Sequence, residues 1–108
     1  MGKLVRDKIP DLITASGRTP KVRVLEDDAY RVALCDKLDE EAAEVRAAAS
    51  TAGLLEELAD VLEVLTALAE HHDACLADII TWAASKRATR GGFTRRLWLE
   101  APDANATA

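Results

Sequence analysis

The sequence predicts a mainly α-helical protein, built as a bundle of antiparallel helices. Apolar residues make up 49% of the 108-residue chain and aromatic residues 4%. Alanine and leucine lead the apolar set, a composition that favours helices. Apolar positions also recur at helical spacing through three long stretches, 27–49, 54–71 and 74–89. Short breaks separate these stretches, so consecutive helices are expected to fold back on one another.

The first predicted element is a short helix within residues 7–17. Asp7 is a candidate N-cap, Pro10 fits the first turn, and Gly17 suits the position just past the C-terminus. Residues 21–25 then alternate apolar and charged side chains, which indicates a short strand or an extended arm.

The first long helix is predicted to begin at a cap formed by Asp27 or Asp28 and to end near Ala49. The sequence Ser-Thr-Ala-Gly at residues 50–53 breaks it, and a second long helix follows over 54–71.

The third long helix is expected over about 74–89, capped by Asp73 and stopped by the glycine pair that begins at Gly91. Residues 93–99 alternate apolar and polar side chains again, which predicts another short strand. The tail, residues 101–108, is expected to be disordered.

Length and charge restrict the class of protein. A chain of 108 residues has room for one domain, predicted over residues 1–100, and a core this small favours completion by a second subunit. The net charge is −5, with acids in the middle of the chain, so no nucleic-acid partner is expected. The chain lacks an apolar run of the roughly 20 residues that span a bilayer, and its start lacks the apolar core of a signal peptide. We therefore expect a cytoplasmic protein without a membrane partner.

Acidic residues of the second long helix fall on different faces. On a helical wheel Glu57 lies inside the apolar stripe and Asp60 flanks it, whereas Glu56 and Glu63 lie on the polar side. The stripe itself is formed by Leu54, Leu58, Val61, Leu65 and Leu68. Only Glu57 and Asp60 therefore need a special explanation.

The preceding helix repeats this pattern. Glu41 projects from the middle of its apolar stripe, Glu44 lies one turn along at the edge, and Glu40 points outward. Lys37 lies on the side of Glu41 and Glu44. If the two helices are antiparallel, two pairs of carboxylates can converge.

The negative charges of converging carboxylates must be compensated by nearby positive charge. Two such charges about 4 Å apart repel by about 4 kcal/mol at an effective dielectric constant near 20. Clustered carboxylate oxygens are natural ligands of divalent cations such as Mg²⁺. The alternative is that the acids reach the edge of the bundle and pair with Lys37, Arg46 or Lys86. Two inward-turned pairs on consecutive helices favour the metal site.

These residues resemble those of a known family. The stretch KLDEEAAEV at 37–45 followed by ELAD at 57–60 resembles the acid signature of the all-α nucleoside triphosphate pyrophosphohydrolases, the MazG-like superfamily. KLVRDKIPDLI at 3–13 and KRATRGGF at 86–93 resemble the two ends of one branch, predicted house-cleaning proteins related to phosphoribosyl-ATP pyrophosphohydrolase.

The resemblance implies a helical bundle of that type and a Mg²⁺-dependent enzyme, with Mn²⁺ as a substitute. It implies cleavage of a nucleoside triphosphate between its α and β phosphates, in a homodimer or homotetramer. Carried over residue by residue, it makes four acids the metal ligands: Glu41, Glu44, Glu57 and Asp60. Glu41, the most inward-facing, is our candidate for a further role as general base.

Cations are expected around the triphosphate as well. Lys86 and Arg90 stand one turn apart and can reach phosphate together, or can simply interact with the C-terminus of their helix. The remaining predicted phosphate contacts are Lys37 and the N-terminal group Lys3, Arg6 and Lys8.

Two alternative functions stay open. The same acids are suited to hydrolysis of phosphoribosyl-ATP itself, rather than of non-standard or surplus nucleotides. The chain could instead be a non-catalytic helical module for oligomerisation or for binding a basic partner. Dependence on a divalent metal distinguishes the module from either enzyme.

Overall fold

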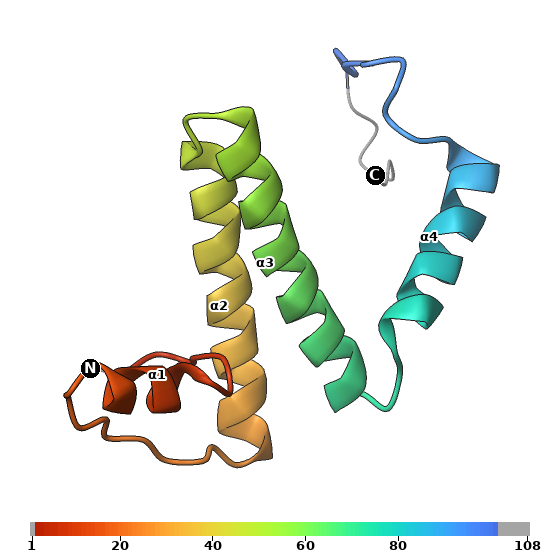
Figure 1. Cartoon of the computed structure of the whole chain (residues 1–108). Coiled ribbons are helices and arrows are strands. Elements are labelled where there is room, and N and C mark those ends of the chain that lie inside the picture. Colours follow the sequence, from red (N-terminus) through yellow and green to blue (C-terminus); the bar gives the residue numbers. More distant parts are fainter. Residues whose placement is uncertain (1, 102–108) are drawn as a thin grey trace. The chain divides into compact units, whose positions relative to one another are not determined.

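The computed structural model describes residues 2–101, in which four helices and no strand occur. They are α1 (Ile9–Ala15), α2 (Asp27–Ala47), α3 (Thr51–His71) and α4 (Leu76–Arg90), shown in Figure 1. The prediction of a mainly α-helical protein is confirmed. Among the described residues, no helix is both long enough and apolar enough to cross a membrane.

The chain divides into two compact units, and each is described by itself. The first, residues 1–76, holds α1, α2 and α3. The second begins at Ala77 and holds nearly all of α4. The single domain predicted over residues 1–100 stays a prediction.

The centre of the first unit is an antiparallel hairpin of α2 and α3, which lie side by side in Figure 1. Tyr30, near the start of α2, packs edge to face on His71 at the end of α3, with ring centroids 5.2 Å apart. Leu34 of α2 and Val64 and Ala69 of α3 are the hydrophobic residues that are buried within residues 2–101. The hairpin thus sets the register in which acidic residues of the two helices meet.

A serine cap decides where α3 begins. Ser50 has extended backbone angles, and its Oγ accepts a hydrogen bond from the Gly53 N–H at 3.0 Å. The hydroxyl satisfies an N–H group that has no partner inside the helix. Helix α3 therefore starts at Thr51, three residues before the predicted Leu54, within the sequence that we expected to be only a break.

Removal of this cap is expected to destabilise the hairpin. Ser50→Ala should lower the free energy of unfolding by about 1 kcal/mol, because the Gly53 N–H loses its acceptor. Urea unfolding followed by circular dichroism measures the change. Ser50→Asp, which keeps an acceptor oxygen, is the matched control and should lose much less. Equal losses in both variants would contradict the capping role.

Three predicted caps are wrong. Glu26, not Asp27 or Asp28, occupies the N-cap position of α2. Lys8, not Asp7, occupies the N-cap position of α1, although Pro10 in the first turn and Gly17 beyond the end, with φ of +88°, lie as predicted. Asp73 has a φ of +60°, whereas a helix N-cap has extended angles. The Asp73 N–H donates to the Glu70 carbonyl at 3.1 Å, so Asp73 closes α3 and α4 starts later, at Leu76.

Neither predicted strand occurs within residues 2–101. Residues 21–25 run without helix or strand, and Val24 is 97% exposed, so the alternating pattern has no neighbouring strand to pair with. In 93–99 the Arg96 N–H donates to the Phe93 carbonyl at 3.0 Å, and Arg96 has a φ of +56°. That turn interrupts the extended run. The predicted disorder of residues 102–108 falls outside the described part of the chain.

Candidate metal centre

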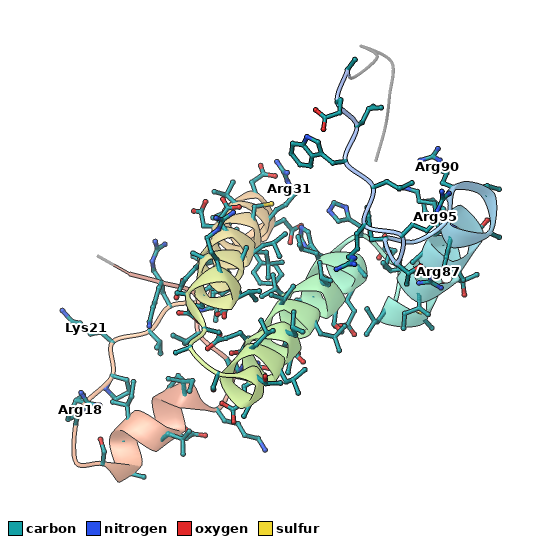
Figure 2. The ribbon with its side chains drawn as sticks, turned by 90° about the horizontal axis from the view of Figure 1, so that it is seen from above. Arg18, Lys21, Arg31, Arg87, Arg90 and Arg95 are labelled. Carbon is teal, nitrogen blue, oxygen red and sulfur yellow. The ribbon has the colours of Figure 1, made fainter. Side chains whose placement is uncertain are left out.

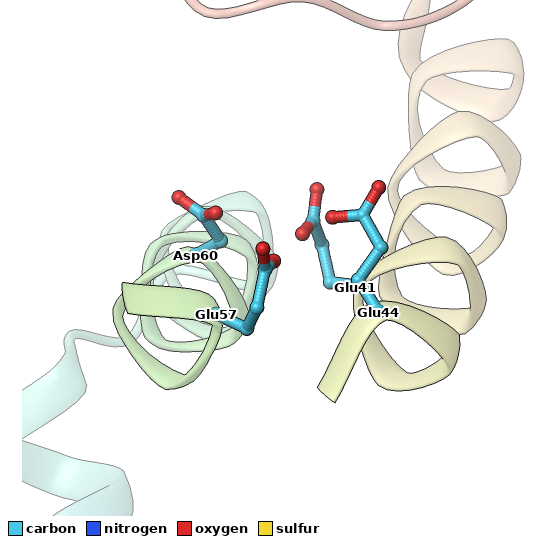
Figure 3. A group of neighbouring side chains, drawn as sticks. All are labelled: Glu41, Glu44, Glu57 and Asp60. Atoms are coloured by element: carbon cyan, nitrogen blue, oxygen red, sulfur yellow. The ribbon is translucent and has the colours of Figure 1, made fainter. Parts of the chain in front are cut away.

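The α2–α3 hairpin brings four carboxylates together. Glu41 and Glu44 lie one turn apart on α2, and Glu57 and Asp60 lie one turn apart on α3. Each offers one carboxylate oxygen, and these four oxygens all lie within 4.8 Å of one another. Figure 3 shows the side chains pointing into the space between the two helices. The convergence expected from the helical wheels is therefore present in the fold.

The cluster is graded in burial. Glu41 is buried, with 6% of its surface exposed, Glu57 and Asp60 are half-buried, and Glu44 is exposed. The outward acids Glu40, Glu56 and Glu63, in contrast, are all exposed, as their positions on the wheel predict.

Two carboxylate oxygens in the cluster lack partners. Oε2 of Glu41 and Oε2 of Glu57 are buried, and neither has a hydrogen-bond partner. A buried acceptor without a donor costs free energy, and a charged one costs more. These two atoms, one from each helix, are therefore available to coordinate a cation.

The electrostatics of Glu41 reflect the same crowding. Burial raises the pKa of the Glu41 carboxyl above its ordinary 4.5, and a hydrogen bond with Glu44 and repulsion from Glu44 and Asp60 raise it further. Lys37, whose Nζ lies 3.6 Å from Oε1 of Glu41, acts in the opposite direction and lowers this pKa without cancelling the rise.

This raised pKa predicts a pH-dependent stability. The folded chain holds the Glu41 proton more tightly than the unfolded chain, so the contribution to stability is complete below about pH 4.5 and is lost as pH rises through the raised pKa. In EDTA, Glu41→Gln should therefore match the wild type in melting temperature below about pH 4.5 and exceed it at neutral pH. Thermal unfolding across a pH series measures this. A difference that does not change with pH would contradict the assignment.

Cations contact both sides of the cluster. Lys37 also lies 3.5 Å from Oε1 of Glu40, so its ammonium is shared between two acids of α2. On the α3 side, Nη2 of Arg6 donates to Oδ1 of Asp60 at 2.7 Å. Sequence reasoning missed this second pair, because 54 residues separate its members and no local periodicity connects them.

The other predicted phosphate contacts lie elsewhere on the two units. Lys3 and Lys8 are exposed in the N-terminal part of the first unit. Lys86 and Arg90 belong to α4 in the second unit, where Arg87, Arg90 and Arg95 gather around the end of that helix in Figure 2. Their roles toward a substrate stay predictions.

The donor set fits a divalent cation. Hard cations such as Mg²⁺ and Ca²⁺ take carboxylate oxygens, and ligands on opposite sides of one ion are separated by about 4 Å for Mg²⁺ and about 5 Å for Ca²⁺. A cluster of oxygens within 4.8 Å has this size, and two of its members are buried and unsatisfied. The four acids are therefore suited to hold such an ion.

Comparison with known proteins agrees with the acid cluster. Residues 12–87 match the family described as phosphoribosyl-ATP pyrophosphohydrolase, and this stretch contains α2, α3 and all four acids. The chain belongs to this family. Membership supports a pyrophosphohydrolase activity in general. Members of the family are also typically dependent on a divalent metal.

The chain is also similar to an uncharacterized protein of Mycolicibacterium smegmatis (strain ATCC 700084 / mc(2)155). The two are 61% identical over 56 residues, which cover 52% of this chain and 57% of the relative. The match thus spans little more than half the length of that protein. No solved structure matches the chain.

Proposed function

We propose that this protein hydrolyses a nucleoside triphosphate between its α and β phosphates, in a Mg²⁺-dependent reaction that yields a monophosphate and pyrophosphate. The observation that carries the proposal is the meeting of four carboxylate oxygens within 4.8 Å, with the buried Oε2 atoms of Glu41 and Glu57 unpartnered. Family membership supports the pyrophosphohydrolase chemistry. Non-standard or surplus nucleotides are the proposed substrates, and Mn²⁺ is the proposed substitute metal.

The four acids have distinct proposed roles. Glu41, Glu44, Glu57 and Asp60 hold the cation, which when bound neutralises phosphate oxygens as a Lewis acid. Glu41 is also proposed to accept the proton of the attacking water, through a carboxylate oxygen that is not used in coordination.

The basic residues are proposed to bind the triphosphate. Lys37 already lies beside Glu41, so it is placed to contact a phosphate that approaches the cluster. Further proposed phosphate contacts are Lys86, Arg90, Lys3, Arg6 and Lys8. Their charges would compensate the pyrophosphate that leaves.

Incubation with a panel of standard and damaged nucleoside triphosphates tests the proposal. Reactions contain Mg²⁺ with or without excess EDTA, and the products are separated by chromatography. Monophosphate and pyrophosphate that form with Mg²⁺ and not with EDTA are the expected result. No turnover of any substrate, together with no Mg²⁺ binding by calorimetry, would favour the non-catalytic helical module.

Phosphoribosyl-ATP is the second candidate substrate. The family match favours it, because this is the reaction that gives the family its description. It contains the same triphosphate group, so the same acids would serve. Comparison of kcat/KM for phosphoribosyl-ATP and for the nucleoside triphosphates of the panel, with the same protein preparation, decides between the two candidates.

A homodimer or homotetramer is proposed as the active assembly. Leu55, Leu58 and Leu62 follow one another along one face of α3 and are 59%, 46% and 47% exposed. Leu58 was predicted in the buried stripe, but the side of α3 buried on α2 is displaced toward Val64. Exposed leucines at this spacing support a subunit interface.

Disruption of this face is expected to change the oligomeric state. Leu62→Lys places a charge in the proposed interface and should shift the protein toward monomer in sedimentation velocity experiments, because burial of an unpaired ammonium is costly. Leu12→Lys on α1 is the matched control, since Leu12 is 62% exposed and lies on another helix. A wild-type protein that sediments as a monomer would contradict the proposal.

A further inference from the structure

Arg6 and Asp60 connect two parts of the first unit that are distant in sequence. Nη2 of Arg6 donates to Oδ1 of Asp60 at 2.7 Å, a distance that is ordinary for a hydrogen bond between charged groups. Asp60 is also one of the four acids whose oxygens cluster within 4.8 Å. The guanidinium group therefore contacts a member of the candidate metal centre directly.

The backbone around Arg6 is fixed by its neighbours. Leu4 and Val5 before it are half-buried, and so is Ile9 at the start of α1. The Arg6 carbonyl accepts a hydrogen bond from the Ile9 N–H at 3.1 Å. Part of the entropy of ordering the arginine is therefore already lost when the segment folds.

The contact with Arg6 leaves one oxygen of Asp60 available to coordinate a cation. The structure gives one bond, from one nitrogen of Arg6 to Oδ1, and a carboxylate has a second oxygen. A carboxylate that ligates a metal is commonly held by a hydrogen bond from a residue that does not itself touch the metal. Loss of that residue lowers the metal affinity by about 10–100-fold. Arg6 is placed to hold Asp60 in this way.

The charges agree with simultaneous binding of Arg6 and a metal. Four ionised carboxylates are largely offset by one divalent cation together with Arg6, beside Asp60, and Lys37, which lies beside Glu41 and is shared with Glu40. Because a guanidinium stays charged at all physiological pH values, this balance does not depend on protonation of Arg6.

We infer that Arg6 is a positioning residue of the metal centre: it holds Asp60 through Oδ1 so that this carboxylate is oriented for the cation. This inference rests on the proposed metal site and adds a role that does not require substrate. It also separates Arg6 from Lys3 and Lys8, which have no such link to the acids among the contacts of the described residues.

Metal affinity in the absence of nucleotide tests the inference. Mg²⁺ is titrated into the full chain by calorimetry, and Mn²⁺ by electron paramagnetic resonance. Arg6→Gln should bind both ions about 10–100-fold more weakly than the wild type. Arg18→Gln is the matched control, because it removes the same charge from an exposed arginine whose contact is with Ser16, and it should change affinity less than about threefold.

Further variants distinguish positioning from other roles. Arg6→Lys should give an affinity between those of the wild type and Arg6→Gln, since lysine restores the charge without the planar donor group. In an Asp60→Asn background, Arg6→Gln should have no additional effect. If Arg6→Gln fails to fold, as judged by circular dichroism, the comparison of Arg6→Lys with wild type carries the test, and equal affinity overturns the inference.

The outcomes also separate this inference from the proposed function. Unchanged or tighter metal binding by Arg6→Gln would overturn the positioning role, and tighter binding would mean that Arg6 competes with the cation for Asp60. In either case a wild-type protein that binds Mg²⁺ leaves the proposed metal site standing. A wild-type protein that binds neither ion overturns both.

Discussion

Glu57→Gln is expected to lower the rate of triphosphate hydrolysis by about 100-fold or more. The variant removes the charge from a half-buried proposed ligand whose Oε2 has no hydrogen-bond partner. A metal ion contributes several kcal/mol of charge stabilisation in the transition state, and each 1.4 kcal/mol or so is a factor of ten in rate. Steady-state kinetics at several Mg²⁺ concentrations measure the loss.

Glu56→Gln is the control for this variant. Glu56 precedes Glu57 on α3 and has the same chemistry, but its side chain is exposed and is not part of the acid cluster. We expect activity within about twofold of the wild type, as for surface substitutions generally. Full activity in Glu57→Gln, or an equal loss in both variants, would show that the metal assignment is wrong.

Glu41→Gln is expected to stabilise the protein in EDTA at neutral pH while abolishing its activity. The raised pKa of Glu41 means that the folded state disfavours the charged carboxylate, so a neutral amide of the same shape removes a penalty. The melting temperature of Glu41→Gln in EDTA should therefore lie above that of the wild type, and each gain of about 1 kcal/mol corresponds to roughly 4–8 °C for a domain of this size.

The response to metal provides the second half of this test. Mg²⁺ should raise the melting temperature of the wild type, because a ligand that binds only the folded state stabilises it, and should raise that of Glu41→Gln much less. Glu40→Gln, on the same helix but exposed, is the control and should keep the wild-type response. A variant that is less stable than the wild type in EDTA would contradict the electrostatic account of Glu41.

Helical periodicity explains most of what was predictable. The sequence located all four helices to within a few residues, and it separated the inward acids from outward ones such as Glu56 and Glu63. These features depend on residues three or four positions apart. The strand predicted over residues 93–99 was wrong, and for residues 21–25 only the strand interpretation was wrong, since an extended arm was the stated alternative. An alternating pattern gives a strand only where another strand is available to pair with it.

The sequence by itself determined which carboxylates turn inward on each of two helices, because the 3.6-residue period of a helix is a local property. Only the tertiary structure decided that their oxygens meet within 4.8 Å, which oxygens stay without partners, and that Arg6 reaches Asp60. These features depend on how α2 and α3 pack and on where the N-terminal segment lies. Contacts between residues 54 positions apart arise from the fold of the whole unit, and no short stretch of sequence encodes them.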